Sequence, residues 1–170
     1  MSGQGTDLRI EDLLPYREEV FLLCLGFSRN AAVAEDLCQD VYLKACCKLD
    51  SVRRPEAARY WLFRLARNLC RDHHRRSRIV SFSPLDSSAD LAVASNDGEL
   101  DDFDDRLARL KSSVEALPWK LREAFVLRTY ARLSYEDVAR TLRLKEGTVM
   151  SRLHRARVAV ALTMKEKPYG

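Results

Sequence analysis

Apolar residues near the C-terminus recur with the period of two helices separated by a short turn. Ser134 is a candidate N-cap for the first helix, with Asp137 three residues further on in a variant of the capping box. Gly147 stands near the start of the second helix. The residues expected to face inward are Val138, Ala139, Leu142, Val149, Leu153, Ala156 and Val160. This pattern predicts a helix-turn-helix.

The outward face of the second helix carries hydroxyls and cations. Its candidate contact residues are Lys145, Thr148, Ser151, Arg152 and Arg155. Such a face suits the major groove of DNA, because arginine forks match guanine edges and hydroxyls hold phosphates. An ordinary amphipathic hairpin with a solvated charged face would show the same pattern. The segment alone therefore favours DNA binding without establishing it.

Three further helices are expected before residue 78. The first carries an apolar pattern from Leu13 to Phe27 and is expected to end near Gly26. The second runs from Ala31 to Leu49, and the third from Glu56 to about Arg76, with a turn at Arg54-Pro55 between them. The apolar stripe of the third helix is Trp61, Leu62, Leu65 and Leu69. Trp61 is therefore interpreted as a core residue rather than a stacking platform for a base.

The third helix also carries a stripe of arginines along one side. Its members are Arg64, Arg67, Arg71, Arg75 and Arg78, and Asp72 is the only acid between Arg59 and Asp86. Like charges at these spacings repel one another and destabilise a helix. A polyanion offsets that repulsion and releases counterions on binding. The stripe therefore favours nucleic-acid contact over a plain solvated face.

Composition and charge divide the chain into three parts. The 170 residues include only 6 Gly and 5 Pro, which favours helix, and no apolar run is long enough to span a membrane. The segment from Ile79 to Asp105 contains eight acidic residues and no Lys or Arg. The rest of the chain carries 29 basic and 17 acidic residues, a net charge of +12. We expect an all-α fold of two small helical domains, 8–77 and 106–165, joined by a flexible acidic linker, 78–105. No signal segment is recognised, so a cytoplasmic protein is expected.

The five cysteines do not show the spacing of a disulfide framework. They are Cys24, Cys38, Cys46, Cys47 and Cys70. Their odd number and helical context predict buried free thiols rather than disulfides. The run from Cys70 to His74 offers a few metal ligands in one turn, but no second ligand cluster accompanies it. We therefore expect no metal and no other cofactor.

Four segments, in this order, resemble the extracytoplasmic-function (ECF) sigma factors, the two-domain promoter-recognition subunits of bacterial RNA polymerase. Residues 34–45 are similar to the polymerase-binding helix of the family's sigma-2 domain, and residues 58–72 to its −10-element helix. Residues 117–128 resemble the opening of a sigma-4 domain, and residues 147–157 its recognition helix. Met150 departs from the family, in which this position is often basic, so the −35 preference does not carry over.

The resemblance implies a protein that binds core polymerase and recognises −35 and −10 elements without catalysis of its own. Its implied partners are promoter DNA, the β′ clamp helices and β flap of core polymerase, and an anti-sigma factor, with no insertion into a membrane. The polymerase-binding residues would be Asp36, Gln39, Asp40 and Lys44 on one helix face, although a solvated face is the alternative. The acidic linker would thread toward the polymerase active-site cleft.

The resemblance also assigns the −10 contacts and their base-reading residue. They would be Arg64, Arg67, Asn68, Arg71 and Arg75. Asn68 matches the family position implicated in reading an exposed base, since an amide both donates and accepts. Opening the duplex requires a pocket for an unstacked base, and the loop from Leu49 to Arg59 is its expected wall.

Two other classes of protein remain as alternatives. A stand-alone helix-turn-helix regulator would explain the C-terminal domain, but it predicts a dimer on an inverted repeat and leaves the arginine stripe unexplained. A metal-dependent nuclease would have to use Cys70, Asp72, His73 and His74, where no nucleophile, base and orienting group are recognisable. The sequence therefore favours a sigma factor that is not an enzyme.

Overall fold

A computed structural model describes residues 8–80 and 100–165, and within these ranges every regular element is a helix. The elements are η1 (Ile10–Tyr16), α1 (Arg17–Ser28), α2 (Ala31–Lys48), η2 (Leu49–Ser51), η3 (Pro55–Ala57), α3 (Ala58–Val80), α4 (Leu100–Ala116), α5 (Trp119–Thr129), α6 (Tyr135–Leu142) and α7 (Glu146–Lys165). The all-α prediction is confirmed. Of the expected flexible linker, 78–105, residues 81–99 lie outside the described residues. Its two ends are helical instead: residues 78–80 continue α3 and residues 100–105 begin α4, so the predicted linker bounds were wrong at both ends.

The N-terminal helices α1, α2 and α3 pack on one another around an apolar core. Its fully buried members include Val20, Leu23, Val41, Leu62 and Phe63. Asn30 caps α2, since its side-chain oxygen accepts a hydrogen bond from the Val33 amide. The expected apolar stripe of α3 faces this core: Leu62 and Leu69 are buried, and Trp61 is partly buried against it. Trp61 is thus a packing residue.

The end of α1 differs from the sequence expectation. The helix does not stop near Gly26 but continues to Ser28, and Arg29 then adopts a left-handed conformation with φ of 57°. Gly26 is buried in the helix, where a Cβ atom would lie 2.7 Å from Val126 Cγ1 and 2.8 Å from Tyr130 Cγ. The glycine permits a close approach of α5 rather than a turn.

The C-terminal helices α4 to α7 form the second domain and contain the expected helix-turn-helix. Ser134 caps α6, with its hydroxyl accepting a hydrogen bond from the Asp137 amide at 3.0 Å, as predicted. Arg143 ends α6 in a left-handed conformation with φ of 55°. All four residues expected to face inward from α7 are buried: Val149, Leu153, Ala156 and Val160.

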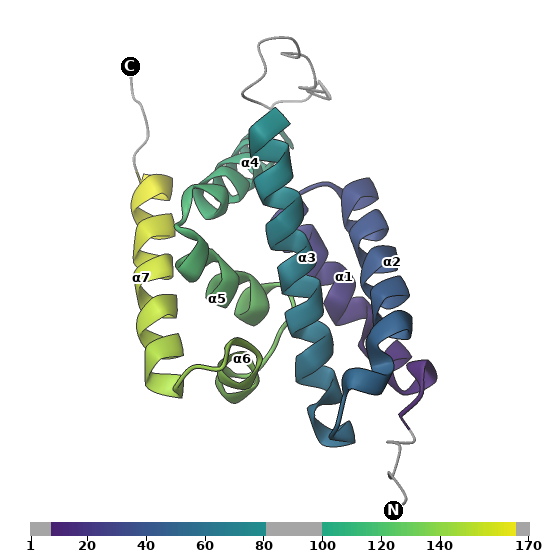
Figure 1. The fold of residues 1–170 in the computed structure, drawn as a ribbon. Coiled ribbons are helices and arrows are strands. Elements are labelled where there is room, and N and C mark those ends of the chain that lie inside the picture. The colour runs from purple at the N-terminus through teal and green to yellow at the C-terminus, as the bar shows by residue number, and fades with distance from the viewer. Residues whose placement is uncertain (1–7, 81–99, 166–170) are drawn as a thin grey trace, which may run out of the picture.

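The two domains pack directly against each other (Figure 1). Helix α3 runs through the middle of the molecule, with α1 and α2 on one side and the C-terminal helices on the other. The inter-domain contacts join α3 to α6 and α1 to α5. The long helix that carries the arginine stripe therefore borders both domains.

Candidate nucleic-acid interface

Helix α7 presents most of the expected −35 residues to solvent. Thr148, Ser151 and Arg155 are exposed on the face opposite its buried side, and Lys145, just before the helix, is exposed as well. Arg152 differs from them, because its side chain is only 15% exposed and its Nη1 atom donates to Glu123 Oε1 at 3.1 Å. Four of the five candidates are thus exposed to solvent, and the fifth, Arg152, is paired with a carboxylate.

The solvent exposure of the arginine stripe changes along α3. Asn68, Arg71 and Arg75 are exposed, whereas Arg64 and Arg67 are partly buried. Burial, together with the positive charges of Arg143 and Arg67, lowers the pKa of Arg64. Arg71 and Arg75 are therefore accessible to a polyanion, whereas Arg64 and Arg67 are partly covered by other parts of the chain.

Glu123 connects the two candidate DNA-binding faces. Its side chain, 5% exposed on α5, accepts from Arg67 Nε at 2.8 Å and from Arg152 Nη1 at 3.1 Å. The Trp119 indole N–H donates to the same carboxylate at 3.0 Å. Sequence reasoning did not single out Glu123. The available signal was a carboxylate beside the apolar run from Ala124 to Leu127, where a buried charge needs partners.

A second carboxylate, Asp137 on α6, contacts the beginning of α3. Arg59 Nη1 and the Tyr60 hydroxyl each donate to it at 3.2 Å. Burial opposes ionisation of this carboxyl, but the Ser134 hydroxyl, the Arg59 cation and the Tyr60 hydroxyl outweigh that effect and lower its pKa. Arg140 adds a hydrogen bond of 3.1 Å to the Tyr60 hydroxyl. Helix α6 is thereby held against the first turn of α3.

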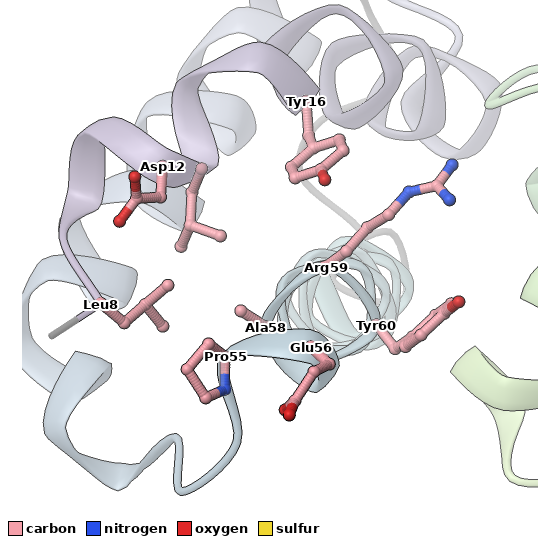
Figure 2. Close-up of a pocket in the computed structure, with 9 residues that line it drawn as sticks. Leu8, Asp12, Tyr16, Pro55, Glu56, Ala58, Arg59 and Tyr60 are labelled. Carbon is pink, nitrogen blue, oxygen red and sulfur yellow. The ribbon is translucent and has the colours of Figure 1, made fainter. Parts of the chain in front are cut away.

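Two cavities border the segment from Pro55 to Tyr60, within the expected wall of the base pocket. One, of about 420 Å³, lies between this segment and the N-terminal residues; Figure 2 shows Pro55 and Ala58 across it from Leu8 and Asp12. The other, of about 480 Å³, has a more cationic lining: Arg54, Glu56, Ala57, Tyr60, Arg64 and Arg140. Only the second cavity is lined by a member of the arginine stripe.

The expected polymerase-binding residues share an exposed face of α2. Asp36, Gln39, Asp40 and Lys44 are all exposed. Beside them Leu43 is 65% exposed, and it borders a groove that also includes Leu14, Arg17 and Tyr42. A charged rim next to exposed apolar side chains is the usual composition of a protein-binding surface.

The cysteines divide into buried and exposed groups. Cys24, Cys38 and Cys70 are buried free thiols, as predicted, but Cys46 and Cys47 are exposed because they lie on the solvent-facing side of α2, so the prediction was wrong for them. Cys70 Sγ lies 3.8 Å from Cys24 Sγ, and this contact together with burial raises the pKa of Cys24. Burial raises the pKa of Cys38 to about 11. The thiols of Cys24 and Cys38 are therefore protonated at neutral pH, which disfavours the nucleophilic thiolate.

The described residues contain neither a metal-binding cluster nor a membrane-spanning helix. Within 8–80 and 100–165, no cluster of three or more His, Cys, Asp or Glu side chains is placed to hold a metal ion. In the same ranges, none of the helices combines the length and apolar composition needed to cross a bilayer.

Both domains match known protein families. Residues 14–79 match the family described as Sigma-70 region 2, and residues 107–160 match Sigma-70, region 4. The RNA polymerase sigma-H factor of Pseudomonas aeruginosa is 34% identical over 169 residues, covering 92% of this chain and 87% of the relative. The ECF RNA polymerase sigma factor EcfG of Rhodopseudomonas palustris is 30% identical, covering 89% and 82%.

Solved structures give the same result over most of the chain. The sigma factor RpoE from Bartonella quintana, in a co-crystal with the anti-sigma factor NepR, has a TM-score of 0.65 at 29% identity and covers 92% of this chain and 96% of its own. CnrH, in complex with the cytosolic domain of CnrY, has a TM-score of 0.66 at 25% identity and covers 93% and 89%. These similarities extend across both domains, which a stand-alone helix-turn-helix regulator would not share.

Proposed function

The chain belongs to the ECF sigma factors of the sigma-70 family, and we propose how it divides promoter recognition between its two domains. As a sigma factor it directs transcription initiation by RNA polymerase. We assign residues 8–77 to core-polymerase and −10 binding, 106–165 to −35 binding, and the residues between α3 and α4 to the linker. The observation that carries this division is the pair of cationic helical faces on α3 and α7, one in each domain.

The −35 element is read by the N-terminal half of α7. Arg155 and Arg152 supply guanidinium forks for guanine edges, and Thr148 and Ser151 supply hydroxyls for phosphates. Lys145, just before the helix, adds a phosphate contact near the positive end of its dipole. Met150 is exposed on the same segment and offers an apolar contact instead of a cation.

The arginine stripe of α3 binds the backbone of the −10 element, and Asn68 on the same helix recognises one of its bases. Arg64, Arg67, Arg71 and Arg75 neutralise phosphates, and Asn68 hydrogen-bonds to an exposed base edge. We assign the unstacked base to the cavity of about 480 Å³, because Arg64 brings the stripe to its edge; Tyr60, which lines both cavities, offers an aromatic ring. The cavity in Figure 2 is less suited, since Leu8 and Leu13 line it together with Asp12.

Core polymerase is bound through the exposed face of α2. Asp36, Gln39, Asp40 and Lys44 would contact the β′ clamp helices, with the exposed Leu43 beside them. The β flap would contact the C-terminal domain. The acidic linker, which lies mostly outside the described residues, would pass toward the active-site cleft and be displaced by the transcript; neutralising its eight acids should then alter abortive initiation and promoter escape.

Activity is controlled by a protein partner in this proposal. The related RpoE was solved with the anti-sigma factor NepR, and CnrH was solved with the cytosolic domain of CnrY. We propose an anti-sigma factor for this chain as well. The chain performs no chemistry itself, because RNA synthesis belongs to the core enzyme, and it acts in the cytoplasm together with that enzyme.

The test is run-off transcription on genomic DNA with purified core polymerase, followed by mapping of start sites. The chain should redirect core polymerase to a defined set of promoters that share two spaced elements. Asp40→Lys should abolish this activity and co-purification with core, while the exposed Glu18→Lys on α1 should leave both unchanged. A chain that neither associates with core polymerase nor alters start-site choice would refute the proposal.

A further inference from the structure

We propose that a cationic groove between the two domains binds a small anionic ligand that carries a chain of phosphates. The groove has a volume of about 640 Å³ and lies between α3 and the turn from α4 to α5. Its charged lining residues are Arg71, Arg75, Arg78, Arg122 and Glu115. The proposed function assigns no role to Arg78 or Arg122, and the groove shares no lining residue with the two cavities beside Pro55 to Tyr60.

The protein does not balance the positive charge of this groove. Its lining carboxylate, Glu115, is already paired with Arg29, whose Nη2 lies 2.5 Å from Glu115 Oε2. Within residues 8–80 and 100–165, the side chains of Arg71, Arg75 and Arg78 take part in no ion pair. Guanidiniums gathered on one face repel one another, and a bound anion would neutralise them.

Arg122 is the most buried cation of the groove. The residue is only 7% exposed, and its guanidinium donates to the backbone carbonyls of Glu115 and Leu117 rather than to a carboxylate. Its Nε atom is buried without a hydrogen-bond partner. A buried charge held only by neutral oxygens is costly, because no counter-charge offsets its desolvation. A bound phosphate would supply that counter-charge.

His74 reports the same positive field from the α3 side. It lines the groove, and its Nε2 atom lies 3.5 Å from Arg122 Nη1. Burial, Arg122 and Arg78 lower the pKa of His74, against the opposing effect of Glu115. The N-terminus of α5 also borders the groove at Pro118 and has no side-chain cap, so the positive end of its dipole adds to the field.

The shape of the groove favours a chain of phosphates over a single small anion. Arg71 and Arg78 are seven positions apart on α3, which separates them by about 10 Å along the helix axis. Guanidiniums spread over that distance suit several phosphates in a row, each bound by a planar fork. The volume also falls within the range of small-molecule pockets, roughly 300–1,000 Å³.

The aromatic side chain of the lining indicates that phosphates, rather than a base, provide the recognition. The Trp119 ring is already stacked on Phe27, with centroids 4.8 Å apart, and on His74 at 5.9 Å. Walls on both sides, from α3 and from the α4–α5 turn, also keep the rigid backbone of a DNA duplex away from Arg122. A small, flexible polyphosphate meets neither obstacle.

This site does not depend on the proposed function, but it overlaps with the proposed −10 surface at two residues. Arg71 and Arg75 belong to both, so a phosphate chain in the groove would compete with the −10 strand for them. Arg78 and Arg122 belong to the groove alone, which makes them the residues that distinguish the two kinds of binding.

The test is isothermal titration calorimetry of the full-length chain, without polymerase, using sodium tripolyphosphate and ATP at constant ionic strength. Arg78→Gln and Arg122→Gln each remove one cation of the groove. Arg76→Gln is the matched control, because Arg76 is an exposed arginine of α3 that does not line the groove. Circular dichroism confirms that each variant is folded.

The wild-type chain should bind tripolyphosphate, and each groove variant should weaken this binding about tenfold through loss of charge-assisted hydrogen bonds. Arg76→Gln should weaken it less than about twofold, the effect of one exposed charge. If Arg122→Gln does not fold, Arg78→Gln decides. Equal affinities for ATP and tripolyphosphate would identify the phosphate chain alone as the ligand, and tighter binding of ATP would add a contact to its nucleoside; both results support the site.

The absence of binding to tripolyphosphate and ATP would overturn the proposal. Equal weakening by Arg76→Gln and Arg78→Gln would do the same, because binding would then follow overall charge. A parallel titration with oligothymidylate tests the DNA alternative: if its binding depends on Arg78 and Arg122 while that of tripolyphosphate does not, the groove is part of the DNA surface and the proposal is wrong.

Run-off transcription by the wild-type holoenzyme is a separate measurement. Its failure would refute the proposed function and leave the calorimetric result standing. Normal run-off by a chain that binds neither tripolyphosphate nor ATP would refute the phosphate site alone.

Discussion

Asn68 and Arg155 are the side chains on which base recognition depends most directly in the proposed function. Both are exposed, on α3 and α7 respectively, and each carries a planar group that can form two hydrogen bonds with a base edge. Phosphate contacts position a protein on DNA but carry no sequence information. Substitutions at these two residues should therefore change selectivity, whereas loss of a stripe arginine should weaken binding to all promoters alike.

Asn68→Ala is expected to lower open-complex formation about tenfold at the preferred −10 sequence and to flatten discrimination among bases at one position, since a bidentate contact contributes about 1–3 kcal/mol. A panel of promoters substituted at each −10 position, assayed by permanganate footprinting of the holoenzyme, measures this. His73→Ala, at an exposed residue on another side of α3, is the control. Unchanged discrimination would remove Asn68 from base reading.

Arg155→Ala is expected to weaken holoenzyme binding to the −35 element by about tenfold or more, and Arg155→Lys should fail to restore it. Lysine keeps the charge but lacks the planar fork that matches a guanine edge. Competition binding with promoters altered at single −35 positions provides the measurement. Full rescue by lysine would instead identify Arg155 as a phosphate contact.

The helices and their caps follow from local sequence. Ser134 caps α6 as predicted, and the inward face of α7 matches its pattern. Asn30, which the sequence analysis did not single out, caps α2. Helix ends were less accurate: α1 passes through Gly26 to Ser28, α3 extends to Val80, and α4 begins at Leu100. Gly26 serves a close contact with α5, about 100 residues away in sequence, and no local pattern reports that contact.

Ser134→Ala should destabilise the C-terminal domain by about 1 kcal/mol, because the Asp137 amide at the start of α6 loses its side-chain acceptor. Urea unfolding followed by circular dichroism measures the change. Ser112→Ala, at an exposed position in the interior of α4, should be nearly neutral. Equal effects of the two substitutions would mean that the cap does not stabilise α6.

At the scale of the whole molecule, the contact between domains should depend on pH. His74 lies against Trp119 and 3.5 Å from Arg122, and burial together with Arg122 and Arg78 lowers its pKa below 6.5, whereas Glu115 opposes this. The unfolded chain then binds a proton at His74 more readily than the folded one. The stability contribution of this site is therefore full above about pH 7 and declines as pH falls through 6.5.

Thermal unfolding between pH 7.5 and pH 5.5 should accordingly show a fall in Tm that is smaller in His74→Gln. His73→Gln is the matched control, because His73 is the exposed neighbour of His74 and should leave the pH dependence as in wild type. If His74→Gln retains the full dependence, another group is responsible for it.

Periodicity, capping residues and the distribution of charge were enough to predict two helical domains, the helix-turn-helix and the arginine stripe, since helices are specified by neighbours three and four residues apart. The docking of the two domains had no such signal. Glu123 and Arg67 are 56 positions apart, and Asp137 and Arg59 are 78 apart; no repeat in the chain relates them. Their pairing depends on how the packed helices meet, and that tertiary arrangement alone brings the acids onto the candidate DNA-binding side chains.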